Sequence, residues 1–350
     1  MTCNGLQRAL IVLALCASSI AAQAQPQDSY TLTLIGTAIP NDPVGWFAVE
    51  DLNVRGEIVG ARPTPDGTTL AFMWRDGVFQ ELNPLVPADA AFASAINDTS
   101  VILGSYSDQQ LGQHNFLLRR ERVTTIEDPD NRTAGALEMN NRSQALFRAT
   151  NDEAGFLWQR GRFSPLEPLP GSQSTSASHL NDWGLVLGTA HFADHSVPVI
   201  WWGRTVMELD RPVGSQFVSG TSLNDLGSVL VDASFPAPIP HTRAVLWVLG
   251  RYFELAPLAG ETSSSATDVN NRNVVVGRSS DLLATHMTAT LWDRARAIDL
   301  NTRVRSDDPL APFVHLQWGL LINDRGLIVA RGVDSRDTDR RFGFYLLKPR

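Results

Sequence analysis

The sequence predicts an all-β fold, a seven-bladed β-propeller built from four-stranded antiparallel blades. Three observations predict it. A short turn motif recurs at spacings of 41 to 53 residues, the same order of short apolar strands surrounds each copy, and the two ends of the chain each carry part of one further unit. We find no convincing helical period of apolar residues, which also favours β structure.

Each repeat begins at an asparagine that follows an apolar residue. The tetrapeptides that open the repeats are NVRG, NDTS, NNRS, NDWG, NDLG, NNRN and NDRG. Gly and Asn tolerate a positive φ, and a leading Asn can bond to its own backbone, so the motif predicts a tight hairpin turn. The seven asparagines are Asn53, Asn97, Asn140, Asn181, Asn224, Asn270 and Asn323. We expect these turns to be structural, because seven equivalent copies around a ring should not converge on one substrate.

The strands around the turn are short and follow a fixed order. After the turn come segments such as VILG, LVLG and VVVG, then an aromatic strand such as AFMWR, GFLWQ or TATLW, and in most units a fourth strand such as YFELAPL. Four such strands form a sheet that cannot bury both faces alone, so the sheets must pack on one another. We therefore expect the aromatic side chains of the third strand to lie in the core between blades.

The two ends of the chain are expected to share one blade. The segment after Asn323 has room for only two more strands, whereas residues 30–36 form an isolated strand ahead of the first complete blade. An open ring would expose a sheet edge. Residues 30–36 should therefore supply the outer strand of the last blade, whose innermost strand is expected near residues 315–321.

The amino terminus predicts export. Arg8 precedes a short apolar run, and the small-residue stretch that follows ends in AQA, which predicts a signal peptide over residues 1–24 that is cleaved after Ala24. Residues 25–350 are then a single propeller domain in the periplasm or outside the cell. No later apolar run approaches the roughly 20 residues of a spanning helix, so we expect no transmembrane segment.

Charge and composition narrow the possible partners. The 350-residue chain has a formal net charge of −8, which disfavours a phosphate-binding surface, so nucleic acid is not expected as a partner. Its two cysteines, Cys3 and Cys16, lie in the predicted signal peptide, so the propeller should contain no disulfide. We find no cofactor-binding or catalytic motif, expect no cofactor, and expect a monomer that binds an unidentified protein or glycan.

The repeats resemble those of the bacterial HAF extracellular repeat proteins, in which a pattern like IN-D-x-G-x-VVG is followed by HAFLW and a D-G turn. The resemblance covers essentially the whole chain after the signal, through the seven asparagine turns and the aromatic third strands. His114-Asn115-Phe116 is nearest to the name-giving triplet, whose histidine the other units lack. The resemblance implies export and a repeat fold, and it implies no particular reaction.

Two groups of side chains are candidates for a metal site. Five histidines fall in or beside the connections between the second and third strands, where the longer and more variable loops are expected to hold any ligand. Within them, His191, Asp194 and His195 could meet only in a tight loop, because residues four apart in an extended strand lie about 13 Å apart. An ordinary polar loop is the alternative. The five histidines are His114, His191, His195, His241 and His286.

The second candidate group is acidic. Asp307 and Asp308 lie in the longest connection between blades, and Asp334, Asp337 and Asp339 lie in the next loop that should reach the same rim. Carboxylates grouped there could bind calcium or serve glycoside chemistry. The alternative is a solvated, charge-balanced loop, since basic residues interleave the second group, namely Arg336, Arg340 and Arg341.

These observations favour a binding or interaction module over an enzyme. Two alternatives stay open: a propeller enzyme acting on extracellular polysaccharide as a lyase or hydrolase, and an envelope-assembly scaffold that uses blade edges. An enzyme would need two or three titratable side chains that converge near the axis.

Overall fold

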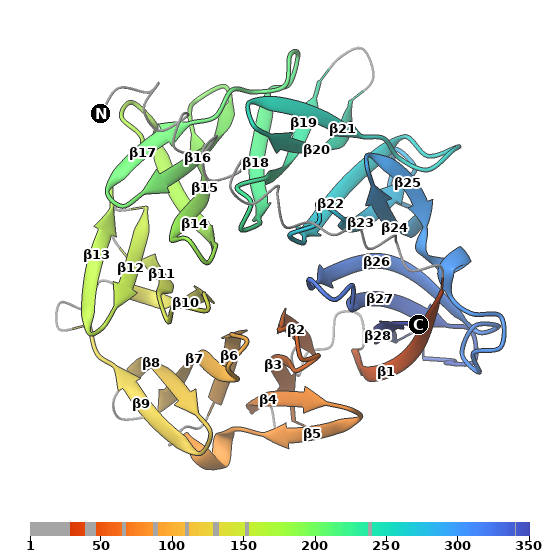
Figure 1. The fold of residues 1–350 in the computed structure, drawn as a ribbon, viewed down its shortest axis with the longest axis horizontal. Helices are drawn as coiled ribbons and strands as arrows, with labels where there is room; N and C mark the ends of the chain where they lie inside the picture. Colours follow the sequence, from red (N-terminus) through yellow and green to blue (C-terminus); the bar gives the residue numbers. More distant parts are fainter. Residues whose placement is uncertain are drawn as a thin grey trace.

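The protein is a closed ring of seven twisted sheets (Figure 1). The computed structural model describes residues 29–38, 47–64, 68–86, 90–108, 112–128, 133–150, 154–236, 240–339 and 341–350. The predicted signal peptide and its cleavage position lie outside these residues, and so do both cysteines and Arg340. In the described part of the chain, no helix is long and apolar enough to cross a membrane.

Each blade contains four antiparallel strands, which we call A to D from the axis outward; they follow chain order in blades 1 to 6, and in blade 7 the outermost strand is β1. Blade 1 consists of β2 (Ala48–Leu52), β3 (Ile58–Pro63), β4 (Thr69–Arg75) and β5 (Val78–Glu81). Blade 2 consists of β6 (Ala90–Ile96), β7 (Val101–Asp108), β8 (Gly112–Arg119) and β9 (Arg122–Ile126). Blade 3 consists of β10 (Thr133–Met139), β11 (Ala145–Ala149), β12 (Gly155–Gln159) and β13 (Arg162–Leu166). Blade 4 consists of β14 (Ser174–Leu180), β15 (Leu185–His191), β16 (Ser196–Trp202) and β17 (Thr205–Glu208).

The remaining blades follow the same plan. Blade 5 consists of β18 (Phe217–Leu223), β19 (Val229–Phe235), β20 (His241–Val248) and β21 (Arg251–Leu255). Blade 6 consists of β22 (Ser263–Val269), β23 (Val275–Ser280), β24 (Met287–Asp293) and β25 (Arg296–Asp299). Blade 7 consists of β26 (Val314–Ile322), β27 (Ile328–Asp334), β28 (Phe342–Pro349) and β1 (Tyr30–Ala38). Two 3₁₀ turns, η1 (Asn83–Leu85) and η2 (Leu300–Arg303), follow β5 and β25.

The amino-terminal strand closes the ring, as predicted. β1 pairs with β28 from Tyr30 opposite Pro349 to Ala38 opposite Phe342, and these two strands from opposite ends of the sequence lie side by side in Figure 1. A second contact holds β1 from the connection between blades 6 and 7, because the Leu32 amide donates to the Asp308 carboxylate at 2.8 Å. The seventh sheet therefore has no missing strand.

The core is divided among the interfaces between blades. The described residues form seven hydrophobic clusters, each built from two neighbouring blades. The third-strand aromatics lie inside them: Trp74, Phe116, Trp201 and Trp292 are at most 1% exposed. The Trp201 and Trp292 indole N–H groups donate to backbone carbonyls at 2.8 and 2.7 Å, so these large rings are buried without an unpaired donor. The prediction that these rings pack between blades is confirmed.

The innermost strand of every blade carries an irregularity that the repeat pattern did not predict. In all seven A strands the pairing register with the B strand shifts three residues before the turn asparagine. Such a bulge re-aims the side chains that follow it. The residue two positions before the asparagine consequently points toward the next blade, which matters for the axial site.

Candidate functional site

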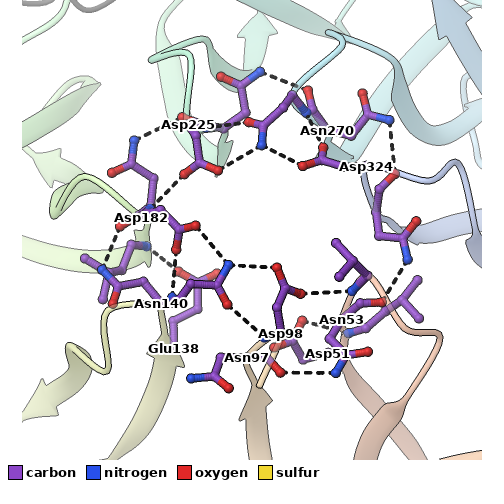
Figure 2. A pocket seen from close by; sticks show the side chains of 18 of the residues that line it. Asp51, Asn53, Asn97, Asp98, Glu138, Asn140, Asp182, Asp225, Asn270 and Asp324 are labelled. Carbon is purple, nitrogen blue, oxygen red and sulfur yellow. Dashed lines mark hydrogen bonds between the residues drawn. The ribbon is translucent and has the colours of Figure 1, made fainter. Parts of the chain in front are cut away.

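The seven A–B turns meet around the axis and enclose a polar cavity. Its volume is about 200 Å³, and all seven turns contribute to its lining. Figure 2 shows their side chains arranged in a ring around an open centre. Antiparallel order places the A–B and C–D turns on one side of the ring, which we call the turn face. The sequence had pointed instead to the opposite side, with its longer loops, and had not anticipated that equivalent turns would converge.

The turn asparagines form the first layer of the cavity. Each is 3 to 6% exposed, and each side-chain Oδ1 accepts the backbone N–H of the residue four positions ahead. In six blades the Nδ2 group donates to the backbone carbonyl of the equivalent asparagine in the next blade, at 2.8 to 3.1 Å. Asn97 is the exception, because its buried Nδ2 has no partner. These side chains therefore both close the turns and join the blades.

The next residue of each turn forms a second layer at the mouth of the cavity. In six steps around the ring, the backbone N–H at this position donates to the side-chain oxygen of its neighbour, at 2.7 to 3.0 Å. Asn141 and Asn271 each bridge the carboxylates on both sides through Nδ2. Val54 offers no acceptor and interrupts the ring. The carboxylates are Asp98, Asp182, Asp225 and Asp324 (Figure 2).

Three further acids lie deeper, at the position that the bulge turns toward the next blade. Asp51 and Asp268 accept backbone N–H groups of the following blade, from Ile96 and Ile322, both at 2.8 Å. Glu138 accepts the Leu180 N–H in the same way and contacts His179 Nδ1 at 3.2 Å. These carboxylates thus have a structural role, since each accepts a backbone N–H of the following blade and so joins two blades near the axis.

Burial perturbs the titration of this inner layer. Burial raises the pKa of Asp51 to about 7, against the hydrogen bond from Ile96 and with a further increase from the charge of Glu138. Burial also raises the pKa of Asp268. For His179, burial lowers the pKa, but the charge and hydrogen bond of Glu138 outweigh it, so the net shift is upward.

We expect the fold to become more stable as the pH falls from 8 to 5.5. A free Asp has a pKa near 3.9, so between about 4 and 7 the folded state holds a proton on Asp51 that the unfolded state has lost, and stability decreases as pH rises. His179 acts in the same direction around its raised pKa. The gain should be on the order of a few kcal/mol at most, measured by denaturant unfolding across this range.

Asp51→Asn should make that pH profile less steep, and the other groups with raised pKa values should keep part of the slope. Carboxylates with lowered pKa values, such as exposed Asp194 and half-buried Asp334, titrate below this range and should not oppose the trend. Asp194→Asn is the matched control and should leave the slope between pH 5.5 and 8 unchanged. A wild-type stability that is constant or rises with pH would contradict the prediction.

The histidine candidates occupy a tight loop but do not form a metal cluster. His195 Nδ1 lies 2.6 Å from Asp194 Oδ1, and its ring stacks on Phe192 at 4.5 Å. His191 is exposed at the end of β15. Across the described residues, no group of three His, Cys, Asp or Glu side chains is arranged to hold a metal ion. His114 and His241 stack on aromatic rings, and His286 pairs with Glu261 at 2.8 Å.

The acidic loop candidates reach the same rim, but most are neutralised by neighbouring arginines. The Ser335 N–H donates to the Phe313 carbonyl at 2.9 Å, which joins the two loops. Asp334 pairs with Arg336 at 2.6 Å, and Arg341 lies 2.8 Å from Asp337 and 3.7 Å from Asp339. Asp307 and Asp308, which are adjacent in the long connection, have different contacts. Asp307 pairs with Arg305 at the surface, whereas Asp308 is 6% exposed and anchors β1.

The axial acids were missed because the pattern that marks them is spread over the whole chain. Asp or Asn follows the turn asparagine in six of seven repeats, and an acid stands two positions before it in three. Either pattern alone looks like ordinary turn chemistry. The carboxylates of the separate repeats come together in a circle only when the ring of blades closes.

Comparisons with known proteins support the fold but assign the chain to no family. No protein-family model matches the sequence, and no curated protein matches it either. Among solved structures, the chain is similar to a puromycin-hydrolysing peptidase of Mycobacterium tuberculosis, with 13% identity and a TM-score of 0.53. That match covers 91% of this chain and 55% of the peptidase chain, so this chain spans about half of that protein.

Two further similar structures are propellers or proteins of similar length. The β-propeller domain of the Trilobed protease from Pyrococcus furiosus matches with 10% identity, a TM-score of 0.56 and coverage of 91% of this chain and 96% of that chain. YCF48 bound to D1 peptide matches with 10% identity, a TM-score of 0.52 and coverage of 94% and 99%. The Pyrococcus domain is described as having an open velcro topology, whereas here β1 pairs fully with β28. At these identities the likeness shows the fold alone.

Proposed function

We propose that this chain is an exported binding module of the HAF-repeat type, which holds a protein or glycan partner on its turn face. The observation that carries the proposal is the state of the axial carboxylates. Asp98, Asp182, Asp225 and Asp324 accept hydrogen bonds from the adjacent blades, so they are held in fixed positions around the cavity. Fixed polar groups around a preformed cavity are typical of ligand recognition.

Export is part of this proposal. The predicted signal peptide with cleavage after Ala24 supports a location in the periplasm or outside the cell. A propeller without cysteine after Ala24 would fold there without disulfide chemistry, because seven interblade clusters and the β1–β28 pairing stabilise the ring. The binding of a peptide by a protein of similar fold is compatible with a protein partner.

One observation favours a second candidate function, an enzyme acting on extracellular polysaccharide. Glu138 and His179 are 3.2 Å apart beside the axial cavity, and the pKa of the neighbouring Asp51 is raised to about 7. A carboxylate–imidazole pair beside a buried acid of raised pKa is the kind of arrangement that general acid–base catalysis uses. Glu138 also accepts the Leu180 N–H, which is the structural reason to rank this candidate second.

Both candidates can be tested in one experiment with the purified chain that begins at residue 25. It is incubated with neutral and acidic polysaccharides and with peptides, and both its melting temperature and the reducing ends released are followed. A binding module should gain stability with one class of ligand and release no product; a ligand at 100 times its Kd adds about 2.7 kcal/mol. Product formation that is lost in Glu138→Gln would overturn the proposal in favour of the enzyme.

A further inference from the structure

A second groove opens on the turn face between blades 2 and 3, away from the axis. Its volume is about 470 Å³. Arg119 and Arg122 come from the C and D strands of blade 2, and Arg142 and Arg160 come from the A–B and C–D turns of blade 3. Partly buried Trp158 also lines the groove. In a protein of formal net charge −8, four guanidinium groups therefore line one groove.

Arg119 and Arg122 stand directly opposite each other across the C–D hairpin of blade 2. Like charges in this cross-strand position destabilise a hairpin. The other five C–D hairpins avoid the arrangement: the corresponding pairs are Arg75 and Val78, Gln159 and Arg162, Trp202 and Thr205, Val248 and Arg251, and Asp293 and Arg296. Among these six C–D hairpins, only that of blade 2 is thus destabilised by two like charges in opposite positions.

No carboxylate in the described part of the chain forms an ion pair with the arginines of the groove. Glu121, in the C–D turn of blade 2, forms no ion pair with a described residue either. Arg142 stacks over the Trp183 ring at 4.7 Å, which is a contact with no negative group. Elsewhere on the surface, arginines such as Arg204, Arg243 and Arg336 do have acidic partners.

We propose that this groove, the arginine groove, binds an acidic saccharide, one whose sugar rings carry carboxylate or phosphate groups. The inference rests on the proposed binding function and names its ligand class. Guanidinium groups form paired, charge-assisted hydrogen bonds with carboxylate and phosphate oxygens, and their convergence predicts a ligand with several such groups. Trp158 between them offers a flat apolar surface for the hydrocarbon face of a sugar ring.

Other polyanions fit the turn face less well. An acidic peptide carries its charges on flexible side chains, so fixing them on the four arginines costs more conformational entropy than fixing groups that are attached to sugar rings. Nucleic acid would extend well beyond the groove, and the carboxylate ring at the axis of the same face would repel its phosphates. A short segment of acidic glycan places oxyanions on the arginines without reaching the axis.

The test is the binding of a short oligogalacturonate, measured by calorimetry and by tryptophan fluorescence with the purified chain that begins at residue 25. Arg119→Ala and Arg122→Ala should each weaken binding about tenfold, and the double variant about a hundredfold, since each removes hydrogen bonds to a charged group. Added salt should weaken wild-type binding as well. Arg251→Ala, which removes an arginine at the same hairpin position of blade 5, should bind as the wild type does.

Arg119→Glu separates loss of binding from loss of fold. It replaces the like-charge pair with an opposite-charge pair, so its melting temperature should equal or exceed that of the wild type while oligogalacturonate binding is lost. A phosphorylated oligomannose, tested beside the galacturonate, decides which oxyanion is preferred. Unchanged binding in the double variant would overturn the proposal, and equal affinity for polyglutamate or for a neutral oligosaccharide would overturn the assignment to acidic sugars.

These outcomes also separate this inference from the broader one. If the chain binds some other ligand and the arginine variants do not affect it, the binding function stands and the arginine groove is wrong. If oligogalacturonate binds but is cleaved in a Glu138-dependent way, the arginine groove stands as a substrate subsite and the non-enzymatic function is wrong.

Discussion

A chain that begins at residue 39 is expected to lose the cooperative unfolding of the complete propeller. Such a chain lacks β1, which pairs with β28 along its whole length and buries Tyr30, Leu32 and Ile35 at 3 to 8% exposure. Each of those side chains contributes roughly 1.5 to 3 kcal/mol of burial, so their sum is comparable to the whole stability of a typical domain. Circular dichroism and urea unfolding of the shortened chain measure the effect.

Point variants of the same strand provide the control. Leu32→Ala should cost about 2 to 5 kcal/mol, whereas Leu34→Ala, on the same strand but 46% exposed, should cost little. A synthetic peptide covering residues 29–38, added to the shortened chain, should restore part of the unfolding transition by occupying the free edge of β28. A shortened chain as stable as the chain that begins at residue 25 would show that β1 does not close the ring.

The second large effect is expected from Gly188→Ala in the B strand of blade 4. A Cβ atom at this position would lie 2.2 Å from the Ser176 backbone oxygen and 2.7 Å from the Trp201 ring. Neither group can move easily, because the Ser176 oxygen belongs to the backbone of the bulged A strand and the Trp201 indole is fully buried. We expect a loss of about 3 kcal/mol or more in the free energy of unfolding, since overpacking that moves backbone is costly.

Gly203→Ala is the matched control in the same blade. Gly203 has a φ of 59°, but an added Cβ would meet nothing within 4 Å, so only the backbone conformation is penalised, by about 1 kcal/mol. If the two variants lose the same stability, the close approach of Ser176 and Trp201 is not what selects glycine at position 188. The equivalent glycines Gly60, Gly104 and Gly277 face the same A-strand carbonyl at 2.0 to 2.2 Å, which explains why the repeat keeps glycine there.

Several features of the fold could be read from the sequence because they repeat locally. Three positions recur because each meets a packing or hydrogen-bond need within one blade or with its neighbour. They are the turn asparagine, the glycine of the B strand and the aromatic residue of the C strand, and the same pattern therefore recurs in each blade. The closure also followed from local information. The segment after Asn323 lacks a strand and residues 30–36 have no blade of their own, so the two had to pair.

The candidate sites could be read only in part. The loop histidines and the acids near residue 334 lie in the loops where the pattern placed them, but their partners are arginines, aromatic rings and single acids. Asp307 and Asp308 are adjacent in sequence and differ completely in use, because the docking of β1 buries one and leaves the other at the surface. A loop sequence does not reveal which distant strand will cover it.

The sequence by itself determined the architecture of this protein: seven blades, their strand order, the turns and the strand that closes the ring, all of which follow from short-range patterns that recur. The tertiary structure alone decided where charge collects. Closing the ring brings the acids of seven separate turns to one axis, and packing blade 3 against blade 2 brings four arginines to one groove. Electrostatic sites depend on distances across space between residues of different blades, and a repeat pattern fixes those distances only after the sheets have packed.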